Sequence, residues 1–335
     1  MVSSDDNVYE AFPDLTISRD GKLICIFLEC KHHHDRSYSR VVLCKSEDRG
    51  RTWSKKEPLS ERGPGWNCPR ISTLKDGRIT ALCDRGDSEK DVQGRKLFLW
   101  RSEDGGKTFL PPVETGIPGF VPDKIIELDD GRWLIASQQY NSKTSFLEQM
   151  LYYSDDEGLN WLGPVPVASK KGLHLCEASI LKLSSGELVA FMREESRVGR
   201  DCYKSISCDG GRTWTGPFRF PLPGCHRPVA GMLKSGMVMI TYRFLQGGKG
   251  ALGWSRQNFF AALTDIESCL STERNEAHAR IMPIDYDRSP VADTGYSGWV
   301  QFEDGEIYIV NYIVDDAPKG HIRGYSLEES EFVLK

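Results

Sequence analysis

Charged and phenolic side chains recur at the beginning of apolar, strand-like segments along this chain of 335 residues. Counting back seven to eleven residues from six glycines that follow these segments gives Glu10, Arg70, Asp123, Glu177, Arg227 and Tyr296. Counting forward seven residues from the same glycines gives Leu28, Asp84, Gln138, Arg193, Arg243 and Tyr312, of which five are polar. Carboxylates, guanidinium groups and a phenol gathered at one mouth could bind a polar ligand and transfer its protons. A channel that is merely filled with water would also be lined by polar side chains.

The six glycines belong to a repeat of a strand, a polar turn and a second, more apolar strand. They are Gly21, Gly77, Gly131, Gly186, Gly236 and Gly305, separated by 56, 54, 55, 50 and 69 residues. Six units therefore fill the chain, with an insertion between Gly247 and Asp287 in which residues 267–278 could form a short helix covering the mouth. Because the two strands are antiparallel, the end of the second lies beside the start of the first, and both polar sets should share one rim.

An eight-residue pattern, Ser-x-Asp-x-Gly-x-(Thr/Asn)-(Trp/Phe), recurs four times between these units. The copies begin at Ser46, Ser102, Ser154 and Ser207, with steps of 56, 52 and 53 residues. Ser and Asp side chains bond to nearby backbone, Gly accepts a positive φ, and the aromatic residue packs the turn onto the sheet. We expect a structural role for this pattern, which is missing in clean form from units five and six.

Many short strands at regular spacing indicate an all-β array, and a four-stranded unit of about fifty residues is typical of a propeller blade. We predict that residues 1–335 form a single domain, a six-bladed β-propeller. The first strand of each blade should line the central channel, so that equivalent positions of the six units converge on one axis.

Composition excludes several classes of function. Charged residues make up 27% of the chain and no apolar run is long enough to cross a membrane, so we expect no membrane insertion. The formal net charge is -5 and no long basic run is present, so we expect no nucleic-acid partner. No C-x-x-C pair suggests zinc.

Five of the ten cysteines, Cys25, Cys30, Cys44, Cys83 and Cys176, lie in or beside apolar runs, which favours free thiols in a reducing compartment. Residues 1–6 contain no basic region followed by an apolar one, so no secretion signal is visible, and the expected localisation is cytoplasmic.

His32, His33 and His34 alternate in direction on an extended chain, so at most two can point the same way. We therefore expect no metal or other cofactor, although one of these imidazoles could act as a general acid or base.

Through its four Asp-containing turns and six repeats, the sequence resembles the sialidase (neuraminidase) superfamily over nearly its whole length. The resemblance implies a tyrosine nucleophile paired to a glutamate. Tyr296, in Gly295-Tyr296-Ser297, matches the nucleophile, and Glu177, in Cys176-Glu177-Ala178-Ser179, matches its partner. A phenol with a pKa near 10 becomes an effective nucleophile when a neighbouring carboxylate accepts its proton.

The resemblance also implies an aspartic acid/base and three arginines that clamp a sugar carboxylate. Asp35, in the loop after His32, His33 and His34, matches the acid/base, and we regard His34 as a further candidate for substrate binding. Arg193 is similar to the second clamp arginine. Arg256 is a candidate for the third, and Arg243 competes with it.

The sequence departs from this family at the first clamp position. The family has Arg-Ile-Pro there, and this chain has Glu10-Ala11-Phe12-Pro13. A glutamate would repel a substrate carboxylate by several kcal/mol in a partly desolvated pocket. We therefore expect Glu10 to accept hydrogen bonds from sugar hydroxyls or to pair with an arginine, and the substrate to differ from that of true sialidases.

Three functions follow from these residues. The first is an exo-acting glycoside hydrolase that binds a terminal, acidic sugar and uses Tyr296, Glu177 and either Asp35 or a neighbouring histidine. The second is a polysaccharide lyase, in which Arg193 or Arg243 neutralises a uronic carboxylate while Tyr296 or a histidine moves the proton. The third is a propeller that binds carbohydrate or protein without catalysis. Arg70, Asp123 and Arg227 would belong to the substrate-binding ring in the first case.

Overall fold

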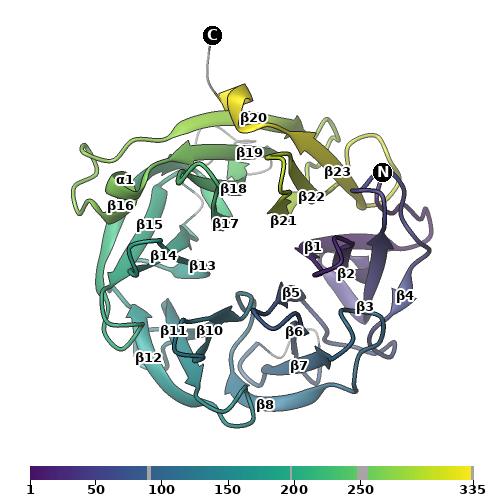
Figure 1. The fold of residues 1–335 in the computed structure, drawn as a ribbon, viewed down its shortest axis with the longest axis horizontal. Helices are drawn as coiled ribbons and strands as arrows, with labels where there is room; N and C mark the ends of the chain where they lie inside the picture. The colour runs from purple at the N-terminus through teal and green to yellow at the C-terminus, as the bar shows by residue number, and fades with distance from the viewer. Residues whose placement is uncertain (89–91, 197, 247–255, 333–335) are drawn as a thin grey trace.

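A computed structural model of the chain describes residues 1–88, 92–196, 198–246 and 256–332, which form six antiparallel sheets around a central axis (Figure 1). In each sheet the strands follow one another from the axis outward in chain order. The prediction of an all-β, six-bladed propeller is therefore confirmed. None of the described helices has the length and apolar character of a membrane span.

Blades 1 to 3 come from the N-terminal half of the chain. Blade 1 consists of β1 (Tyr9–Ile17), β2 (Leu23–His32), β3 (Asp35–Ser46) and β4 (Glu57–Pro58). Blade 2 consists of β5 (Arg70–Thr73), β6 (Ile79–Arg85), β7 (Lys96–Ser102) and β8 (Val113–Pro118). Blade 3 consists of β9 (Ile126–Glu127), β10 (Trp133–Tyr140), β11 (Leu147–Ser154) and β12 (Leu162–Ala168).

Blades 4 to 6 complete the ring. Blade 4 consists of β13 (Leu175–Lys182), β14 (Leu188–Glu194), β15 (Asp201–Ser207) and β16 (Thr215–Pro223). Blade 5 consists of β17 (Cys225–Met232), β18 (Val238–Leu245), β19 (Gln257–Thr264) and β20 (Arg280–Tyr286). Blade 6 has three strands, β21 (Thr294–Gln301), β22 (Ile307–Ile313) and β23 (His321–Leu327), and a 3-10 helix, η2 (Glu329–Phe332), follows it.

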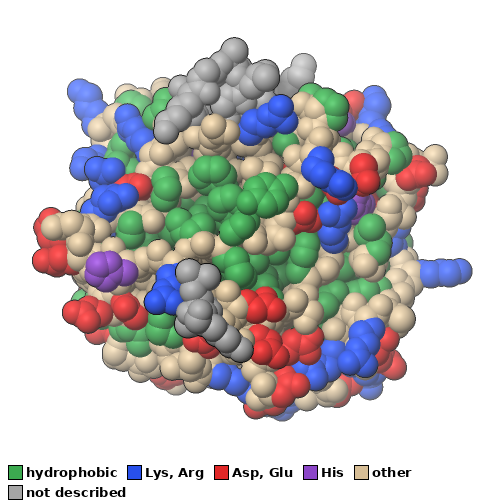
Figure 2. Space-filling view, turned by 90° about the horizontal axis from the view of Figure 1, so that it is seen from above, with side chains coloured by type: hydrophobic (Ala, Val, Ile, Leu, Met, Phe, Trp, Pro, Cys, Tyr) green, Lys and Arg blue, Asp and Glu red, His purple; other side chains and the backbone are tan. Residues whose placement is uncertain are grey.

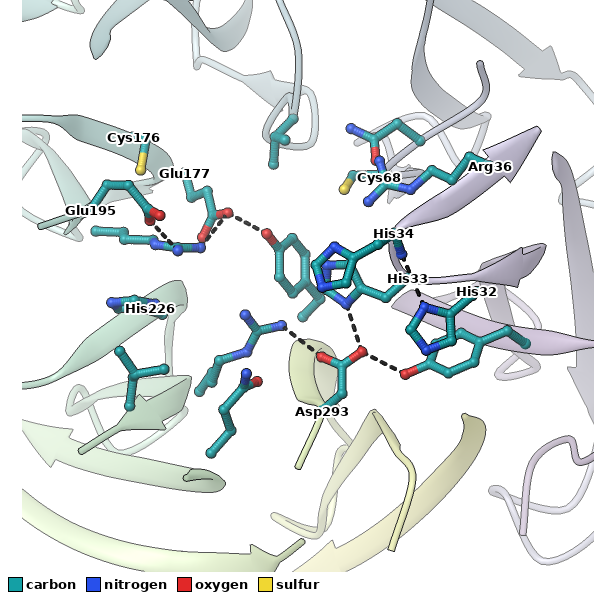
Figure 3. Close-up of a pocket in the computed structure, with 18 of the residues that line it drawn as sticks. His32, His33, His34, Arg36, Cys68, Cys176, Glu177, Glu195, His226 and Asp293 are labelled. Atoms are coloured by element: carbon teal, nitrogen blue, oxygen red, sulfur yellow. Dashed lines mark hydrogen bonds and ion pairs between the residues drawn. The ribbon is translucent and has the colours of Figure 1, made fainter. Parts of the chain in front are cut away.

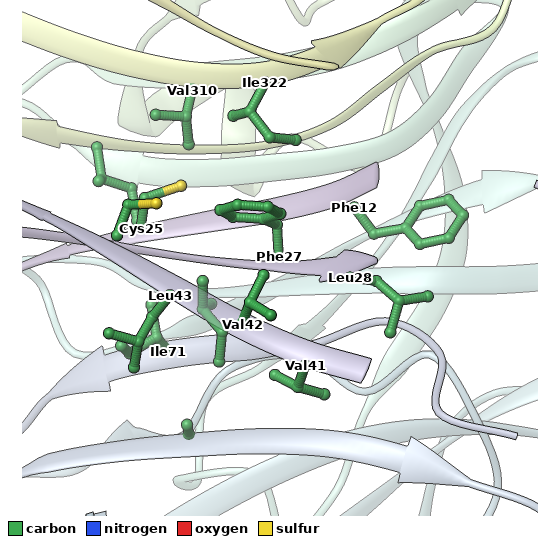
Figure 4. Packing of buried hydrophobic residues seen from close by; sticks show 14 of the residues in the cluster. Phe12, Cys25, Phe27, Leu28, Val41, Val42, Leu43, Ile71, Val310 and Ile322 are labelled. Atoms are coloured by element: carbon green, nitrogen blue, oxygen red, sulfur yellow. The ribbon is translucent and has the colours of Figure 1, made fainter. Parts of the chain in front are cut away.

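The two ends of the chain meet in blade 6. Ser3 forms an antiparallel bridge with Ile322 of β23, and the Ile322 amide donates to the Ser3 carbonyl at 2.9 Å. The N-terminal segment thus extends the last sheet outward and ties it to blade 1. Apolar side chains reinforce this junction, because Phe27 of β2, Ile71 of β5 and Val310 of β22 belong to one buried cluster (Figure 4).

The repeated turns lie where the sequence predicts them. The glycines Gly21, Gly77, Gly131, Gly186, Gly236 and Gly305 lie between the first and second strands of their blades, all with positive φ. Each Asp-containing pattern begins with the last residue of a third strand. In the fourth copy, the Asp209 carboxylate accepts bonds from the Ser207 hydroxyl (2.8 Å) and the Thr213 amide (2.9 Å).

The glycine of this pattern allows neighbouring blades to approach closely. Gly50 has a φ of 85°, and a Cβ atom at this position would lie 2.2 Å from the ring of Tyr308 in blade 6. Any side chain here would both strain the backbone and push two blades apart. The pattern therefore fastens the turns of blades 1 to 4, and in blade 1 it also shapes the contact with the neighbouring blade 6.

The insertion in blade 5 forms a shorter helix than the sequence predicts. The helix α1 covers Ile266–Leu270 only, begins at the N-cap Asp265, and lies on the outer side of the ring beside β16 (Figure 1). Residues 247–255 of the predicted insertion lie outside the described residues. Buried Lys204 of β15 anchors α1, since its amine donates to the carbonyls of Ser268 (2.6 Å) and Cys269 (2.8 Å).

The outer surface carries charges of both signs. Figure 2 shows one side of the molecule, on which acidic and basic side chains are interspersed around an apolar area. Among the described residues visible on this face, the basic side chains do not form a continuous surface of the kind that binds a nucleic-acid backbone.

Replacing Asp209 by alanine should lower the free energy of unfolding by about 1–2 kcal/mol, because the turn loses the hydrogen bonds that its carboxylate accepts. Urea unfolding would measure this loss. The matched control is C208A in the same turn, where the exposed side chain should contribute less than about 0.5 kcal/mol. Equal losses in the two variants would contradict the fastening role.

Replacing Lys204 by methionine should remove a pH dependence of stability. Burial lowers the pKa of Lys204 from 10.5 to about 8. Between these values the unfolded chain binds a proton that the folded chain has released, so the contribution of Lys204 to stability rises with pH. The difference in unfolding free energy between wild type and K204M should grow by up to about 3 kcal/mol from pH 8 to 10.5.

The exposed Lys170 provides the control, since K170M should leave the wild-type pH dependence unchanged. A constant difference between wild type and K204M across this range would contradict the prediction.

Candidate active site at the mouth of the channel

Four innermost strands carry a β-bulge at the same place. Pairing with the second strand is interrupted between Ala11 and Asp14 in β1, and at the equivalent points of β13, β17 and β21. A left-handed residue occupies each bulge: Phe12 (φ 57°), Glu177 (φ 50°), Arg227 (φ 50°) and Tyr296 (φ 55°). This conformation costs a non-glycine residue about 1–2 kcal/mol. Backbone strain of this kind concentrates at functional sites, so the four bulges indicate a functional site at the mouth of the channel.

A cavity of about 900 Å³ opens at this end of the channel, and residues from all six blades line it. Glu177 of blade 4 and Tyr296 of blade 6 both line it and are hydrogen-bonded to each other. Figure 3 shows the position of Glu177 in this wall. Part of the wall is aromatic, because Phe120 stacks on Tyr140 with ring centres 6.0 Å apart. A concave site with an apolar wall and a few converging charges is typical of a small-ligand site.

Tyr296, Glu177 and Arg193 form a chain of direct contacts. The Tyr296 hydroxyl donates to Oε1 of Glu177, which also accepts a bond from Arg193 at 2.8 Å. Arg193 pairs in turn with Glu195, which directly follows the same strand, β14. All three members of the chain are almost completely buried. The Gln138 side chain fixes the bulge itself by accepting the Glu177 amide at 2.5 Å.

The charges around this chain keep the glutamate ionised and the phenol neutral. Burial favours a raised pKa for Glu177, but Arg193, Arg227 and the Tyr296 hydrogen bond outweigh it and hold the pKa below its ordinary value. Burial raises the pKa of Tyr296 well above 10, and the Glu177 charge adds to this effect. The resting site therefore has a carboxylate ready to accept the phenol proton.

A second group of contacts centres on Asp293. Its Oδ2 accepts bonds from the Tyr9 hydroxyl (2.5 Å) and from Nδ1 of His33 (2.6 Å), and its Oδ1 accepts the Tyr312 hydroxyl (2.7 Å). Tyr312 in turn accepts a bond from Arg243 at 2.8 Å. The guanidinium of Arg243 also lies 4.9 Å from the centre of the Tyr296 ring, so it connects the two groups of contacts.

The titration of this second group follows from its burial and charges. Burial opposes ionisation of Asp293, but His33, Arg243 and the Tyr9 hydrogen bond hold its pKa well below the usual range. Burial lowers the pKa of His33 below 6.5, although Asp293 acts in the opposite direction. Asp293 is thus ionised, and His33 is the group of this pair that can change its protonation state near neutral pH.

Arg70 and Asp123 do not reach the cavity, although the sequence places them in the binding ring. They precede their turn glycines by seven and eight residues, whereas the four bulge residues precede theirs by nine. Arg70 donates to the Ser297 carbonyl of blade 6 (3.2 Å), and Asp123 accepts the Ile180 amide of blade 4 (2.7 Å). Arg227 occupies a bulge, but it packs 5.7 Å from the Tyr296 ring centre and donates to a carbonyl of blade 3. These three residues join blades.

Glu10 also lies away from the cavity, and its expected place at the mouth needs correction. Its carboxylate is fully buried between the Ser3 hydroxyl (2.8 Å) and the Lys56 amine (2.7 Å). The reason is the register of β1. Phe12, Glu177, Arg227 and Tyr296 each precede their turn glycine by nine residues, whereas Glu10 precedes Gly21 by eleven. Blade 1 therefore presents Phe12, not Glu10, at the bulge.

Three other predicted residues also have well-defined places. Asp35 pairs with Lys31 at 2.8 Å and with Ser37, and it does not line the cavity. These partners hold the pKa of Asp35 well below its usual range. Arg256 is exposed and outside the cavity, whereas its competitor Arg243 lines it. His34 lines the cavity, with its ring centre 4.6 Å from that of His33.

The structure adds residues that the repeat does not predict. Asp293 comes from the loop before β21, and Arg36 enters from β3, with its guanidinium 5.0 Å from the centre of the Phe12 ring. Among the described lining residues, five basic side chains face three carboxylates: Arg36, Arg95, Arg193, Arg243 and Lys319 against Glu177, Glu195 and Asp293. Arg95 is paired with buried Asp84 at 2.7 Å, so these described groups together leave only a small excess of positive charge in the cavity wall. The described residues contain no group of three or more histidine, cysteine or carboxylate side chains that could hold a metal ion.

Comparison with known proteins places this geometry in context. The sequence profile of the BNR repeat-like domain matches residues 64–309. A Dyadobacter fermentans protein of unknown function has a structure with a TM-score of 0.81 and 23% identity, over 98% of this chain and 96% of that chain. No curated protein matches the chain in sequence.

Two enzymes of known activity have similar structures. The Hadza microbial sialidase Hz136 has a TM-score of 0.72 and 17% identity, over 97% of this chain and 66% of that chain. The GH93 alpha-L-arabinofuranosidase of Fusarium graminearum has a TM-score of 0.67 and 12% identity, over 98% and 95%. At these identities the similarities show the fold alone, because one fold can support many functions.

Proposed function

The chain belongs to the BNR repeat-like domain family, and from this premise we propose that it is a glycoside hydrolase acting on a terminal, acidic sugar. The observation that carries the proposal is the buried contact chain of Tyr296, Glu177 and Arg193 in the wall of the cavity. The known enzymes with this fold include a sialidase and an arabinofuranosidase, and both act on glycosides.

The contact chain supplies a nucleophile together with its base. As the Tyr296 oxygen attacks the anomeric carbon, its proton passes to Glu177, which the neighbouring arginines keep ionised at neutral pH. The neutral phenol approaches an acidic sugar without charge repulsion. The glycosyl-tyrosine intermediate is then hydrolysed by water, and Tyr296 recovers its proton from Glu177.

The acidic character of the proposed substrate follows from the excess of basic side chains. Arg193 contacts Glu177, and Arg243 lies against the Tyr296 ring. The planar guanidinium group of an arginine can donate two parallel hydrogen bonds to a carboxylate. The chain has Glu10 at the first clamp position of sialidases, and this side chain is paired with Lys56 outside the cavity. A substrate whose acid group differs in position from that of a sialoside fits this arrangement better.

A polysaccharide lyase is the second candidate, and the position of His33 favours it. This imidazole has a lowered pKa, so it is available as a base near neutral pH, and it lies in a cavity with two buried arginines that could neutralise a uronic carboxylate. A lyase would abstract a proton next to that carboxylate and release an unsaturated product. Non-catalytic carbohydrate binding is the outcome if neither reaction occurs.

Turnover should depend on the Tyr296 hydroxyl. With 4-methylumbelliferyl glycosides of sialic, glucuronic and galacturonic acids and of arabinofuranose, we expect release of the fluorophore from at least one acidic sugar. Y296F should lower kcat by at least about three orders of magnitude, a rise of about 4 kcal/mol in the barrier. Thermal unfolding of the variant should stay close to that of wild type.

Tyr325 provides the matched control, because its hydroxyl also donates to a carboxylate, that of Asp285 at 2.8 Å, but lies outside the cavity. Y325F should retain turnover. Wild-type turnover that survives Y296F would remove Tyr296 from the mechanism.

Hydrolase and lyase differ in their products. Hydrolysis of a uronide polymer should give reducing ends without new ultraviolet absorbance, whereas a lyase creates a conjugated double bond that absorbs. We expect no such absorbance with wild-type protein and polymers of glucuronic, galacturonic or mannuronic acid. An increase that H33Q abolishes would instead establish the lyase.

A further inference from the structure

The hairpin between β2 and β3 brings two imidazoles over the mouth. His32 pairs with Asp35 across this hairpin, so His33 and His34 form its two-residue tip. Figure 3 shows His33 directed to Asp293. The Phe12 ring lies between this tip and Tyr296, with its centre 5.1 Å from that of His33 and 4.9 Å from that of Tyr296. Blade 1 thus contributes to the cavity from a turn, while Asp35, the first residue of β3, is held outside by Lys31 and Ser37.

Several contacts fix the orientation of His33. Asp293 binds Nδ1 at 2.6 Å, and the same carboxylate is oriented by Tyr9 and Tyr312. The Phe12 ring packs edge-on against the imidazole, with centres 5.1 Å apart. Because Asp293 is ionised, Nδ1 carries a proton in both forms of the imidazole. Nε2 is therefore the atom that gains and loses the second proton.

The carboxylates of the cavity are poorly suited to donate a proton. Glu177 and Asp293 have lowered pKa values, so both are ionised at neutral pH. Glu195 is held in an ion pair with Arg193. Asp35, the expected acid, has a lowered pKa and lies outside the cavity.

We infer that His33, held by Asp293, is the catalytic acid and base of the proposed glycosidase and acts at the glycosidic oxygen through Nε2. This inference rests on the proposed function. In the first step the bond between the anomeric carbon and the leaving oxygen breaks, the Tyr296 oxygen bonds to that carbon, the Tyr296 proton moves to Glu177, and Nε2 protonates the leaving oxygen. In the second step water bonds to the anomeric carbon and gives its proton to Nε2, while Tyr296 leaves and recovers its proton from Glu177.

The charges that face His33 come from three blades. They are Asp293 and Tyr312 of blade 6, Arg243 of blade 5, and Arg36 and His34 of blade 1. Burial and the two arginines lower the pKa of His33 below 6.5, against the effect of Asp293. The acid form is lost as the pH rises through this lowered pKa. We therefore expect kcat/KM to fall above a pH that is lower than 6.5.

The decisive experiment varies the leaving group. The sugar identified by the substrate screen would be prepared with a 2,4-dinitrophenyl group, which leaves without protonation, and with a methyl group, which needs it. H33Q should lower the rate with the methyl glycoside by about 10²–10⁴-fold. The first-turnover release of dinitrophenolate should fall much less, because that step needs no acid.

A second variant tests the orientation of His33. D293N removes the carboxylate that favours the imidazolium, so the alkaline limb of kcat/KM for the methyl glycoside should move to lower pH. An unchanged limb would contradict the inference even if D293N lowered the rate. A mere loss of structure would lower both substrates equally and would not move the limb.

Asp35 is the competing acid, and D35N is the control. In H33Q we expect a much larger loss with the methyl glycoside than with the dinitrophenyl glycoside, and in D35N we expect no such difference. The reverse pattern in the two variants would overturn the inference. Equal losses with both substrates in H33Q would overturn it as well. Turnover by wild type without a leaving-group effect in H33Q would overturn this inference alone. A wild-type chain inactive on all glycosides would overturn the proposed function and this inference together.

Discussion

The mouth of this propeller depends on a residue in the left-handed backbone region at the same step of four innermost strands. The strands pair regularly with their neighbours on both sides of the bulge, so the sheet holds a conformation that a free chain would avoid. In blades 4 and 6 the bulge presents Glu177 and Tyr296 to each other across the channel. A regular strand would alternate its side chains between the two faces of the blade. The contact between phenol and carboxylate is thus a consequence of backbone strain in two separate blades.

Polar residues that follow the bulge position have a different role, which is to join consecutive blades. Asp14 accepts the Ile71 amide (3.0 Å), Asp123 accepts the Ile180 amide (2.7 Å), and Ser179 accepts the Ala230 amide (3.1 Å). Each bond runs from one innermost strand to the next, and buried polar groups of this kind need such partners. The channel therefore contains two levels of polar side chains. The deeper level maintains the ring, and the level at the mouth is available for a ligand.

The sequence predicts the fold well because each blade is a local unit whose turns recur at nearly constant spacing. It also selects Glu177, Arg193, Arg243 and Tyr296, which the structure brings together in one cavity, while their chemical roles remain predictions. The same procedure misplaces Glu10, since a variable offset from the turn glycine cannot detect a bulge that requires a constant one. Asp293 and His33 come from connecting segments outside the repeat. Their contact joins residues 260 positions apart, which no spacing within a blade encodes.

Blade 1 shows how a change at one bulge alters the whole mouth. Two residues after the position where the family resemblance leads one to expect an arginine, Phe12 packs against Tyr296 (4.9 Å between ring centres) and against His33 (5.1 Å). An apolar ring excludes water from both groups, and charges interact more strongly where the effective dielectric constant is low. Positive charge enters instead with Arg36, which lies over the same ring. The guanidinium that blade 1 contributes to the cavity is thus that of Arg36, which enters from the strand after the hairpin and not from the innermost strand.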